Sequence, residues 1–214
     1  PKALLASLIL YLLAVYGPLI MYAGISVDDW GDIAHNLDCS SFWHCYGTWF
    51  PLFSNRPLAP LPITVLTFAL GTWYSGYLII NCLIYLLAIG LCAKVIHALS
   101  NYKSAITFFV FAAIPIIAMP VITSPINQST ATVSFLLWSV SLVALMRFVQ
   151  TARTFYWITS YFCLLLAFLT YEVILPLLIL TALLPWIWDA KKFALFRSHY
   201  WLQFLLPILT CLLY

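Results

Sequence analysis

The chain is a series of long, continuous apolar runs separated by short polar stretches. A helix needs about 20 apolar residues to cross about 30 Å of hydrocarbon at 1.5 Å per residue, and most of the runs approach that length. A transmembrane barrel would instead need short segments of alternating hydrophobicity. The pattern therefore predicts an all-α polytopic membrane protein of about seven transmembrane helices. The spans are expected at 3–25, 76–98, 104–122, 131–150, 154–171, 173–188 and 199–214.

Composition agrees with this class of protein. The chain is 65% hydrophobic and 7% charged, with a mean hydropathy of +1.05, which exceeds what a soluble core of this size requires. The net charge of +3 is small and scattered, so no nucleic-acid partner is expected. The first apolar run is too long for a signal peptide and lacks a small-residue cleavage site. Because the last run ends without a polar tail, we expect a single membrane module over 1–214 that is the N-terminal part of a longer protein.

The apolar segment 57–75 admits two arrangements, because three prolines crowd its start and it is short for a span. If it crosses the membrane, the basic residues near 94–103 face the same side as the acidic loop. If it lies in the interface or re-enters, the basic residues all face one side, as the positive-inside rule requires of the cytoplasm. We therefore expect residues 26–75 to form an extracytoplasmic loop with interfacial helices. The basic residues then assigned to the cytoplasm are Lys94, Lys103, Arg147, Arg153, Lys191, Lys192 and Arg197.

Four prolines fall inside the expected spans and should kink or break them. Proline lacks an N–H donor, so carbonyl groups in the preceding turn lose their helical partners. We expect these carbonyls to be free near the outer face. The four residues are Pro115, Pro120, Pro176 and Pro185.

Most of the ionisable chemistry lies in the loop 26–56, which holds four of the six acidic residues, two of the four histidines and two of the six cysteines. A membrane protein that gathers such groups at one face tends to work there. The polar segment 123–130 and the turn 171–172 are expected on the same side. The sequence therefore predicts a catalytic loop at 26–75 and a site on the extracytoplasmic face.

The acidic pair Asp28-Asp29 follows the first span directly. One carboxylate can accept a proton from a hydroxyl nucleophile, and a second beside it can raise the pKa of the first or help to hold a divalent cation. Trp30 would anchor the loop at headgroup depth. In the alternative, one aspartate caps an interfacial helix that begins near Trp30 and the other is solvated.

Other polar residues expected on this face are candidate binding groups. Arg56 can clamp a lipid phosphate through two N–H groups, or it can be a snorkelling arginine without a ligand. Glu172 beside Tyr171 is an acidic group at membrane depth, for which a function is the default interpretation. Asn127 and Gln128 can hydrogen-bond sugar hydroxyls or water.

Cys39 and Cys45 are six residues apart in the same loop. A disulfide suits an oxidising compartment and is geometrically possible at this spacing. His35 and His44 make a zinc site conceivable, although the spacing matches no standard zinc pattern. Free thiols are the third alternative.

These residues together resemble the GT-C class of integral-membrane glycosyltransferases. A first span, an acidic pair and an aromatic-rich loop that ends in Arg56-Pro57-Leu58 are similar to that class. Asn81 in the following span and Ser124-Pro125 resemble positions in the protein O-mannosyltransferase-like and the transmembrane-plus-tetratricopeptide mannosyltransferase branches. The Tyr171-Glu172 turn resembles the bacterial O-antigen glucosyltransferases.

The resemblance implies transfer of a sugar from a polyprenyl-phosphate donor to a glycan, lipid or protein acceptor on the extracytoplasmic face of a bacterial inner (plasma) membrane. It implies inversion at the sugar, with Asp28 as general base, Asp29 as support or alternate, and Arg56 on the carrier phosphate. A divalent cation is possible, but the second outer loop lacks the acidic residue that several branches carry there.

Two alternatives stay open. A transporter or flippase of lipid-linked oligosaccharides would also gather polar groups, but it should place ionisable residues at mid-membrane. A membrane acyltransferase would need a buried histidine, and His97 and His199 are expected on the cytoplasmic side.

Overall fold

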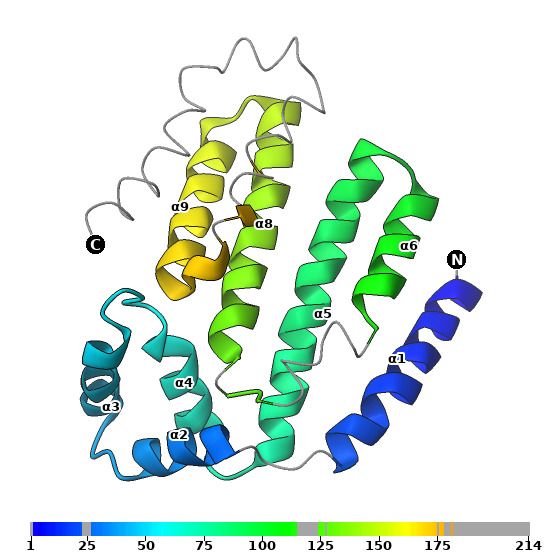
Figure 1. Ribbon diagram of the computed structural model, residues 1–214. Coiled ribbons are helices and arrows are strands. Elements are labelled where there is room, and N and C mark those ends of the chain that lie inside the picture. The colour runs from blue at the N-terminus through cyan, green and yellow to red at the C-terminus, as the bar shows by residue number, and fades with distance from the viewer. Residues whose placement is uncertain are drawn as a thin grey trace.

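The computed structural model describes residues 2–22, 27–114, 124–126, 128–174, 176–177 and 181, and every element in them is helical (Figure 1). The prediction of an all-α chain is confirmed for this part of the protein. The elements are α1 (Lys2–Tyr22), α2 (Val27–Leu37), α3 (Phe42–Trp49), η1 (Phe50–Phe53), α4 (Pro60–Leu70), α5 (Tyr74–Leu99), α6 (Tyr102–Ala112), α8 (Ser129–Thr151), α9 (Thr154–Thr170) and η2 (Glu172–Ile174).

Two of these helices, α5 and α8, are long and apolar enough to cross a membrane. Their 26 and 23 residues correspond to lengths of about 39 and 35 Å. Among the other apolar helices, α4 and α6 have 11 residues each and α9 has 17, while α1 has 21. The spans expected at 173–188 and 199–214 lie almost wholly outside the described residues, and residues 172–174 form the 3-10 turn η2.

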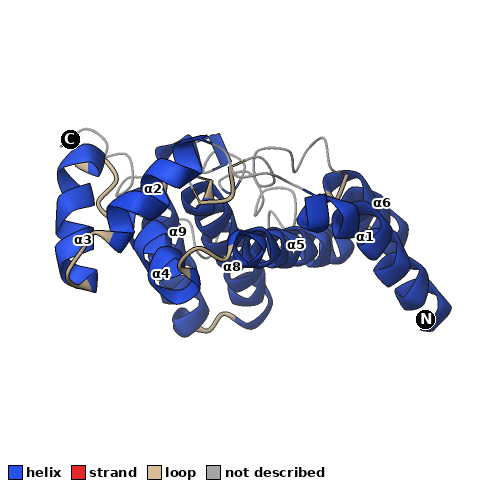
Figure 2. Cartoon of the chain, turned by 90° about the horizontal axis from the view of Figure 1, so that it is seen from below, coloured by secondary structure: helices blue, strands red, loops and turns tan. Residues whose placement is uncertain are grey.

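The long helices stand in a row, with α5 and α8 running in the same direction at its centre (Figures 1 and 2). Helix α6 returns along α5, α9 returns along α8, and α1 lies at the outer edge beside α5. Helices α2, α3 and α4 form a separate layer at the end where α5 and α8 begin. An apolar cluster that includes Ile33, Ile63, Tyr77 and Ile126 joins this layer to the row.

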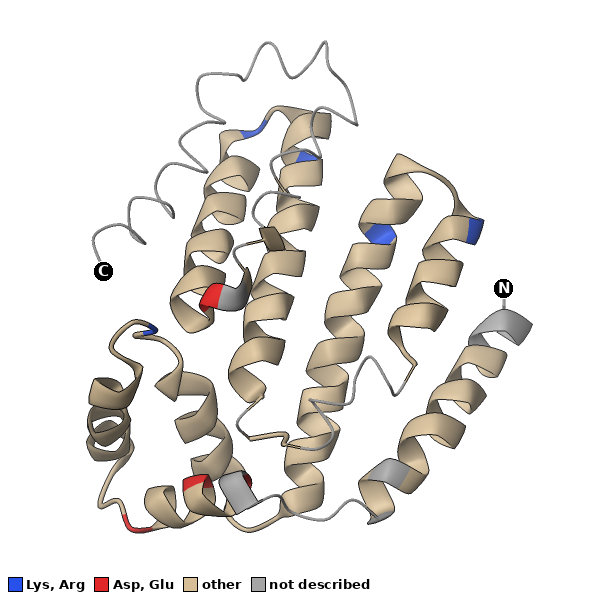
Figure 3. Ribbon diagram, viewed as in Figure 1, with Lys and Arg blue, Asp and Glu red and all other residues tan. Residues whose placement is uncertain are grey.

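The basic residues of the described helices lie at one end of the helix axes, the basic end of the row, and the acidic residues lie toward the other end, where Arg56 pairs with Glu172 (Figure 3). Lys94 and Arg147 lie toward the ends of α5 and α8, while Lys103 and Arg153 stand at the starts of α6 and α9. These helix directions bring all four residues to the end opposite α2–α4. These four residues thus share one end, as expected, while Lys191, Lys192 and Arg197 lie outside the described residues.

The segment that admitted two arrangements contains the short helix α4. Its 11 residues span about 16 Å, which is far less than about 30 Å of hydrocarbon. Pro60 and Pro62 occupy its first turn, where a missing N–H costs least. Gly71 ends it at φ 53°, a conformation that glycine adopts without steric cost. The length of α4 favours the interfacial arrangement over a crossing.

The span expected at 104–122 stops being helical at Ala112. Pro115 follows three residues later, and the residue before a proline disfavours helical angles. We expected the carbonyls at this break to be free. They are not free, because the hydroxyl groups of two tyrosines donate hydrogen bonds to them. Tyr85 Oη donates to Ala112 O at 2.8 Å and Tyr16 Oη donates to Ala113 O at 3.0 Å. Pro120 and Pro185 lie outside the described residues.

Candidate functional site

The acidic pair begins α2 rather than preceding it. Because the helix starts at Val27, neither Asp28 nor Asp29 is an N-cap, and the capping alternative for a helix starting near Trp30 is wrong. Both residues lie in the first turn, where the helix dipole favours negative charge. Trp30 is 49% exposed on the same helix, as suits an interfacial anchor. The side chain of Asp28 lies outside the described part of the structure.

Asp29 is completely buried and anchors a distant segment. Its Oδ1 accepts hydrogen bonds from Ser124 Oγ at 3.0 Å and from the backbone N–H of Ile126 at 3.2 Å. A buried carboxylate needs such donors, because burying it without them is very costly. Asp29 therefore holds the 124–126 segment, which lies just before α8, against the head of α2.

Asn81 holds the same segment from the side of α5. Its Nδ2 donates to Pro125 O at 2.8 Å and to Tyr77 O at 3.0 Å, while its Oδ1 accepts from Thr132 Oγ1 at 2.8 Å. Asn81 is fully buried, so both ends of its amide are used without competition from water. Asn81, Ser124 and Pro125, which carried part of the resemblance, thus meet in one polar network with Asp29.

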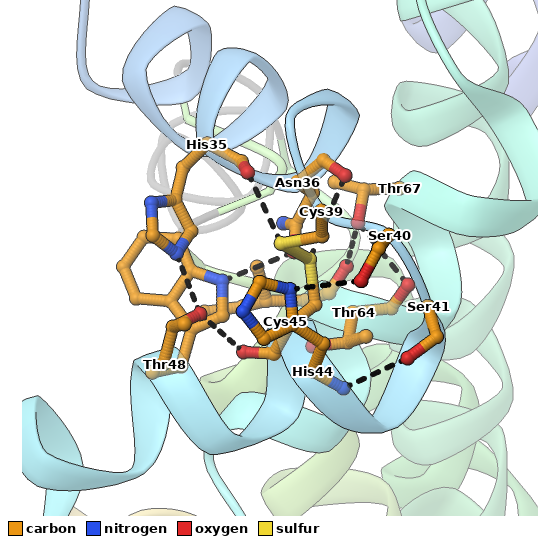
Figure 4. The surroundings of a disulfide bond; sticks show 12 residues. His35, Asn36, Cys39, Ser40, Ser41, His44, Cys45, Thr48, Thr64 and Thr67 are labelled. Atoms are coloured by element: carbon orange, nitrogen blue, oxygen red, sulfur yellow. Dashed lines mark hydrogen bonds between the residues drawn. A yellow bond between two sulfur atoms is a disulfide. The ribbon is translucent and has the colours of Figure 1, made fainter.

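Cys39 and Cys45 form a disulfide, the first of the three alternatives (Figure 4). It closes the turn between α2 and α3, and two further contacts reinforce that turn: Trp49 Nε1 donates to Asn36 Oδ1 at 3.1 Å, and His35 Nε2 lies 2.8 Å from Thr48 Oγ1. The loop is thereby built as a compact two-helix unit.

The zinc alternative does not fit this geometry, because neither bonded sulfur is a thiolate. Their contacts at 3.2 and 3.5 Å with the carbonyl oxygens of His35 and Asn36 are not hydrogen bonds, since an oxidised sulfur carries no proton. His44 Nδ1 pairs with Ser40 Oγ at 3.3 Å. Within the described residues no three His, Cys, Asp or Glu side chains are placed to hold a metal ion.

Three candidate binding residues meet at the end of α9. Arg56 Nε lies 2.6 Å from Glu172 Oε2, and the guanidinium carbon of Arg56 lies 5.1 Å from the centre of the Tyr171 ring. The ring of Phe53 is 5.9 Å away on the loop side. The contact is an ion pair and not a hydrogen bond, because the Arg56 N–H group does not point at the Glu172 oxygen. Arg56 is therefore held in place by other residues of the protein, whether or not it also has a ligand.

The backbone reinforces this meeting of loop and helix. The N–H of Leu58 donates to Leu169 O at 3.1 Å, and Tyr46 Oη donates to Pro57 O at 2.6 Å. Both bonds fix the chain just after Arg56, one to α9 and the other to α3. The Arg56 side chain is 27% exposed, so it is fixed in place and still open to solvent.

The candidate residues thus fall into two clusters. Arg56, Tyr171 and Glu172 form one of them, and Asp29 belongs to the network around 124–126. Gln128 joins that network through its backbone, since its N–H donates to Ser124 O at 2.9 Å. Asn127 lies outside the described residues.

Sequence reasoning missed the serines that join the long helices. Ser134 Oγ donates to Ala167 O at 2.7 Å, and Ser141 Oγ lies 3.0 Å from Ser160 Oγ, both between α8 and α9. Hydroxyl groups on facing transmembrane helices commonly form hydrogen bonds that join the helices. The seven-residue spacing of Ser134 and Ser141 was the available signal, because it puts both on one face of α8.

No protein-family model, no curated protein and no solved structure matches this chain.

Proposed function

We propose that this chain is the membrane module of a GT-C-like glycosyltransferase. In this proposal about seven helices cross the membrane, the α2–α4 layer faces the extracytoplasmic side of a bacterial inner membrane, and the basic end of the row faces the cytoplasm. A disulfide in the α2–α3 turn supports the outer placement, because such bonds persist in oxidising compartments. The donor is a polyprenyl-phosphate sugar, and the acceptor is a glycan, lipid or protein hydroxyl.

The observation that carries the proposal is the meeting of Arg56, Tyr171 and Glu172. Glu172 Oε2 lies 2.6 Å from Nε of Arg56, and no hydrogen bond joins the terminal amino groups of the guanidinium to another described residue. Those groups are the pair that binds a phosphate in bidentate fashion. Tyr171 and Phe53 hold the guanidinium plane, which lowers the entropy lost when a phosphate binds.

Asp28 is the general base in this proposal. Asp29 is unsuited to that role, because its Oδ1 already accepts two hydrogen bonds and the residue is buried. The oxygen of the acceptor hydroxyl attacks the anomeric carbon while its proton passes to the carboxylate of Asp28. The bond from that carbon to the phosphate oxygen breaks, and polyprenyl phosphate leaves with the electron pair. The configuration at the anomeric carbon is inverted in this single displacement.

A divalent cation has little support in this arrangement. Ser124 Oγ and the Ile126 N–H already donate to Oδ1 of Asp29, and the segment they belong to carries no acidic residue. We therefore assign no step to a metal ion.

The proposal is tested by supplying a panel of radiolabelled polyprenyl-phosphate sugars to membranes that contain the full-length protein. We expect transfer from one donor, a raised KM for that donor in Arg56→Lys, which retains the charge but loses the planar fork, and a larger effect in Arg56→Gln. Arg153→Gln, at the other end of the row, is the matched control and should leave KM unchanged. Movement of labelled lipid across the bilayer without transfer would replace this proposal with the transporter or flippase.

A further inference from the structure

A cavity of about 610 Å³ lies between α1, α5 and α6, far from the acidic loop. Its walls are mainly apolar and include Leu8 and Tyr11 of α1, Gly90 of α5, and Ile106 and Phe109 of α6. The volume is in the range of pockets that hold small molecules or lipid chains. These positions place the cavity near the end of the helices at which the basic residues lie.

Small residues on facing helices create this space. Gly90 and Ala93 of α5 and Ala105 of α6 all line it. A Cβ added at Gly90 would come no closer than 3.8 Å to the ring of Phe109, which is an ordinary contact. Alanine would therefore fit at position 90 without a clash, and a larger side chain there would extend from a position that lines the cavity.

One end of the cavity is polar and positive. Lys94, His97 and Tyr102 line it, and the His97 and Tyr102 rings meet edge to face at 5.8 Å. The acidic residues of the described chain all lie in α2, in the turn after it, or in η2, so none neutralises Lys94. An apolar chamber with a cation at its mouth is complementary to an amphiphile with an anionic head.

We propose that this cavity binds one acyl chain of an anionic phospholipid from the leaflet at the basic end, with the phosphate facing Lys94. The charge at the mouth selects an anionic headgroup, and the apolar walls take the chain. This site is separate from the proposed donor site, which lies at the opposite end of the row, and it does not depend on sugar transfer. It requires only that α5 crosses the membrane.

The test is native mass spectrometry of the full chain released from detergent after incubation with phosphatidylglycerol or with phosphatidylcholine. We expect wild type to retain one phosphatidylglycerol in preference to phosphatidylcholine. Lys94→Gln should lower that retention about fivefold, the factor expected for one basic residue facing an anionic lipid. Gly90→Leu should abolish retention of either lipid.

Arg153→Gln removes a positive charge at the same end of the row but outside the cavity lining, and it should retain phosphatidylglycerol as wild type does. Equal retention of the two lipids by wild type would overturn the proposal. So would unchanged retention in a monodisperse, folded Gly90→Leu protein, because it would show that the lipid binds elsewhere. Failure of wild type to retain either lipid would also overturn it, and would point to a protein segment as the occupant.

Discussion

Replacing Asp29 should loosen the 124–126 segment before it affects any chemistry. Two donors converge on one buried carboxylate oxygen, Ser124 Oγ at 3.0 Å and the Ile126 N–H at 3.2 Å. A hydrogen bond to a charged group contributes about 1.5–3 kcal/mol, so Asp29→Ala should cost about 3–5 kcal/mol of stability. Asp29→Asn keeps a carbonyl oxygen that can accept both bonds, and it should cost about 1–2 kcal/mol.

The assay is thermal unfolding of the purified protein in detergent, followed by tryptophan fluorescence. For a chain of this size each kcal/mol shifts Tm by about 2–4 °C. Asp29→Ala should therefore lower Tm by about 10 °C and Asp29→Asn by a few degrees. Asp38→Ala removes an exposed carboxylate from the turn after α2 and is the matched control, for which no shift is expected.

Hydrogen exchange adds a local readout to this experiment. The amide of Ile126 is protected by Asp29, so its exchange should accelerate in Asp29→Ala and remain slow in Asp38→Ala. A folded Asp29→Ala protein with wild-type Tm and wild-type exchange at Ile126 would refute the anchoring role. Asp29 would then again be a candidate for the base.

Three further changes probe other parts of the fold. Reduction of the Cys39–Cys45 disulfide, or its replacement by serines, should lower the free energy of unfolding by about 2 kcal/mol, which is the loop-entropy value for so short a ring. The measurement is Tm with and without reductant, in wild type and in the double serine variant. Asn81→Ala leaves the Pro125 carbonyl and the Thr132 hydroxyl without this buried partner, and it should lower the free energy of unfolding by about 2–4 kcal/mol. A denaturant titration that finds a loss of less than about 1 kcal/mol would contradict the role of Asn81 in the network. Ser134→Ala removes one interhelical bond and should cost only about 0.6 kcal/mol in the same titration, so a large loss would show that the bond does more than join two helices.

The long helices and the division of charge were accessible from the sequence for physical reasons. A run of apolar residues as long as that in α5 can satisfy its backbone in lipid only as a helix. The basic residues at 94–103 and 147–153 could be assigned to one end because short connections force neighbouring helices to be antiparallel. The short α4 was foreseeable from its crowded prolines.

The pairings at the site were not accessible in the same way. Asp29 meets Ser124 across 95 positions, and Arg56 meets Glu172 across a still longer stretch. Periodicity reports which face of a helix is apolar, but it carries no information about which distant polar groups come into contact. The tyrosine hydroxyls that cap the end of α6 are a further case, because tyrosines inside apolar spans look the same in sequence whether or not they donate to a distant carbonyl.

We propose that Asp28 removes the proton from the acceptor hydroxyl during sugar transfer. The most direct test compares initial transfer rates of wild type and Asp28→Asn with the donor selected from the panel, after both proteins are shown to unfold at the same temperature. A general base contributes about 10²–10⁴ to the rate, so Asp28→Asn should lose at least about 100-fold in kcat with little change in the donor KM. A folded Asp28→Asn protein that transfers sugar at the wild-type rate would contradict the account.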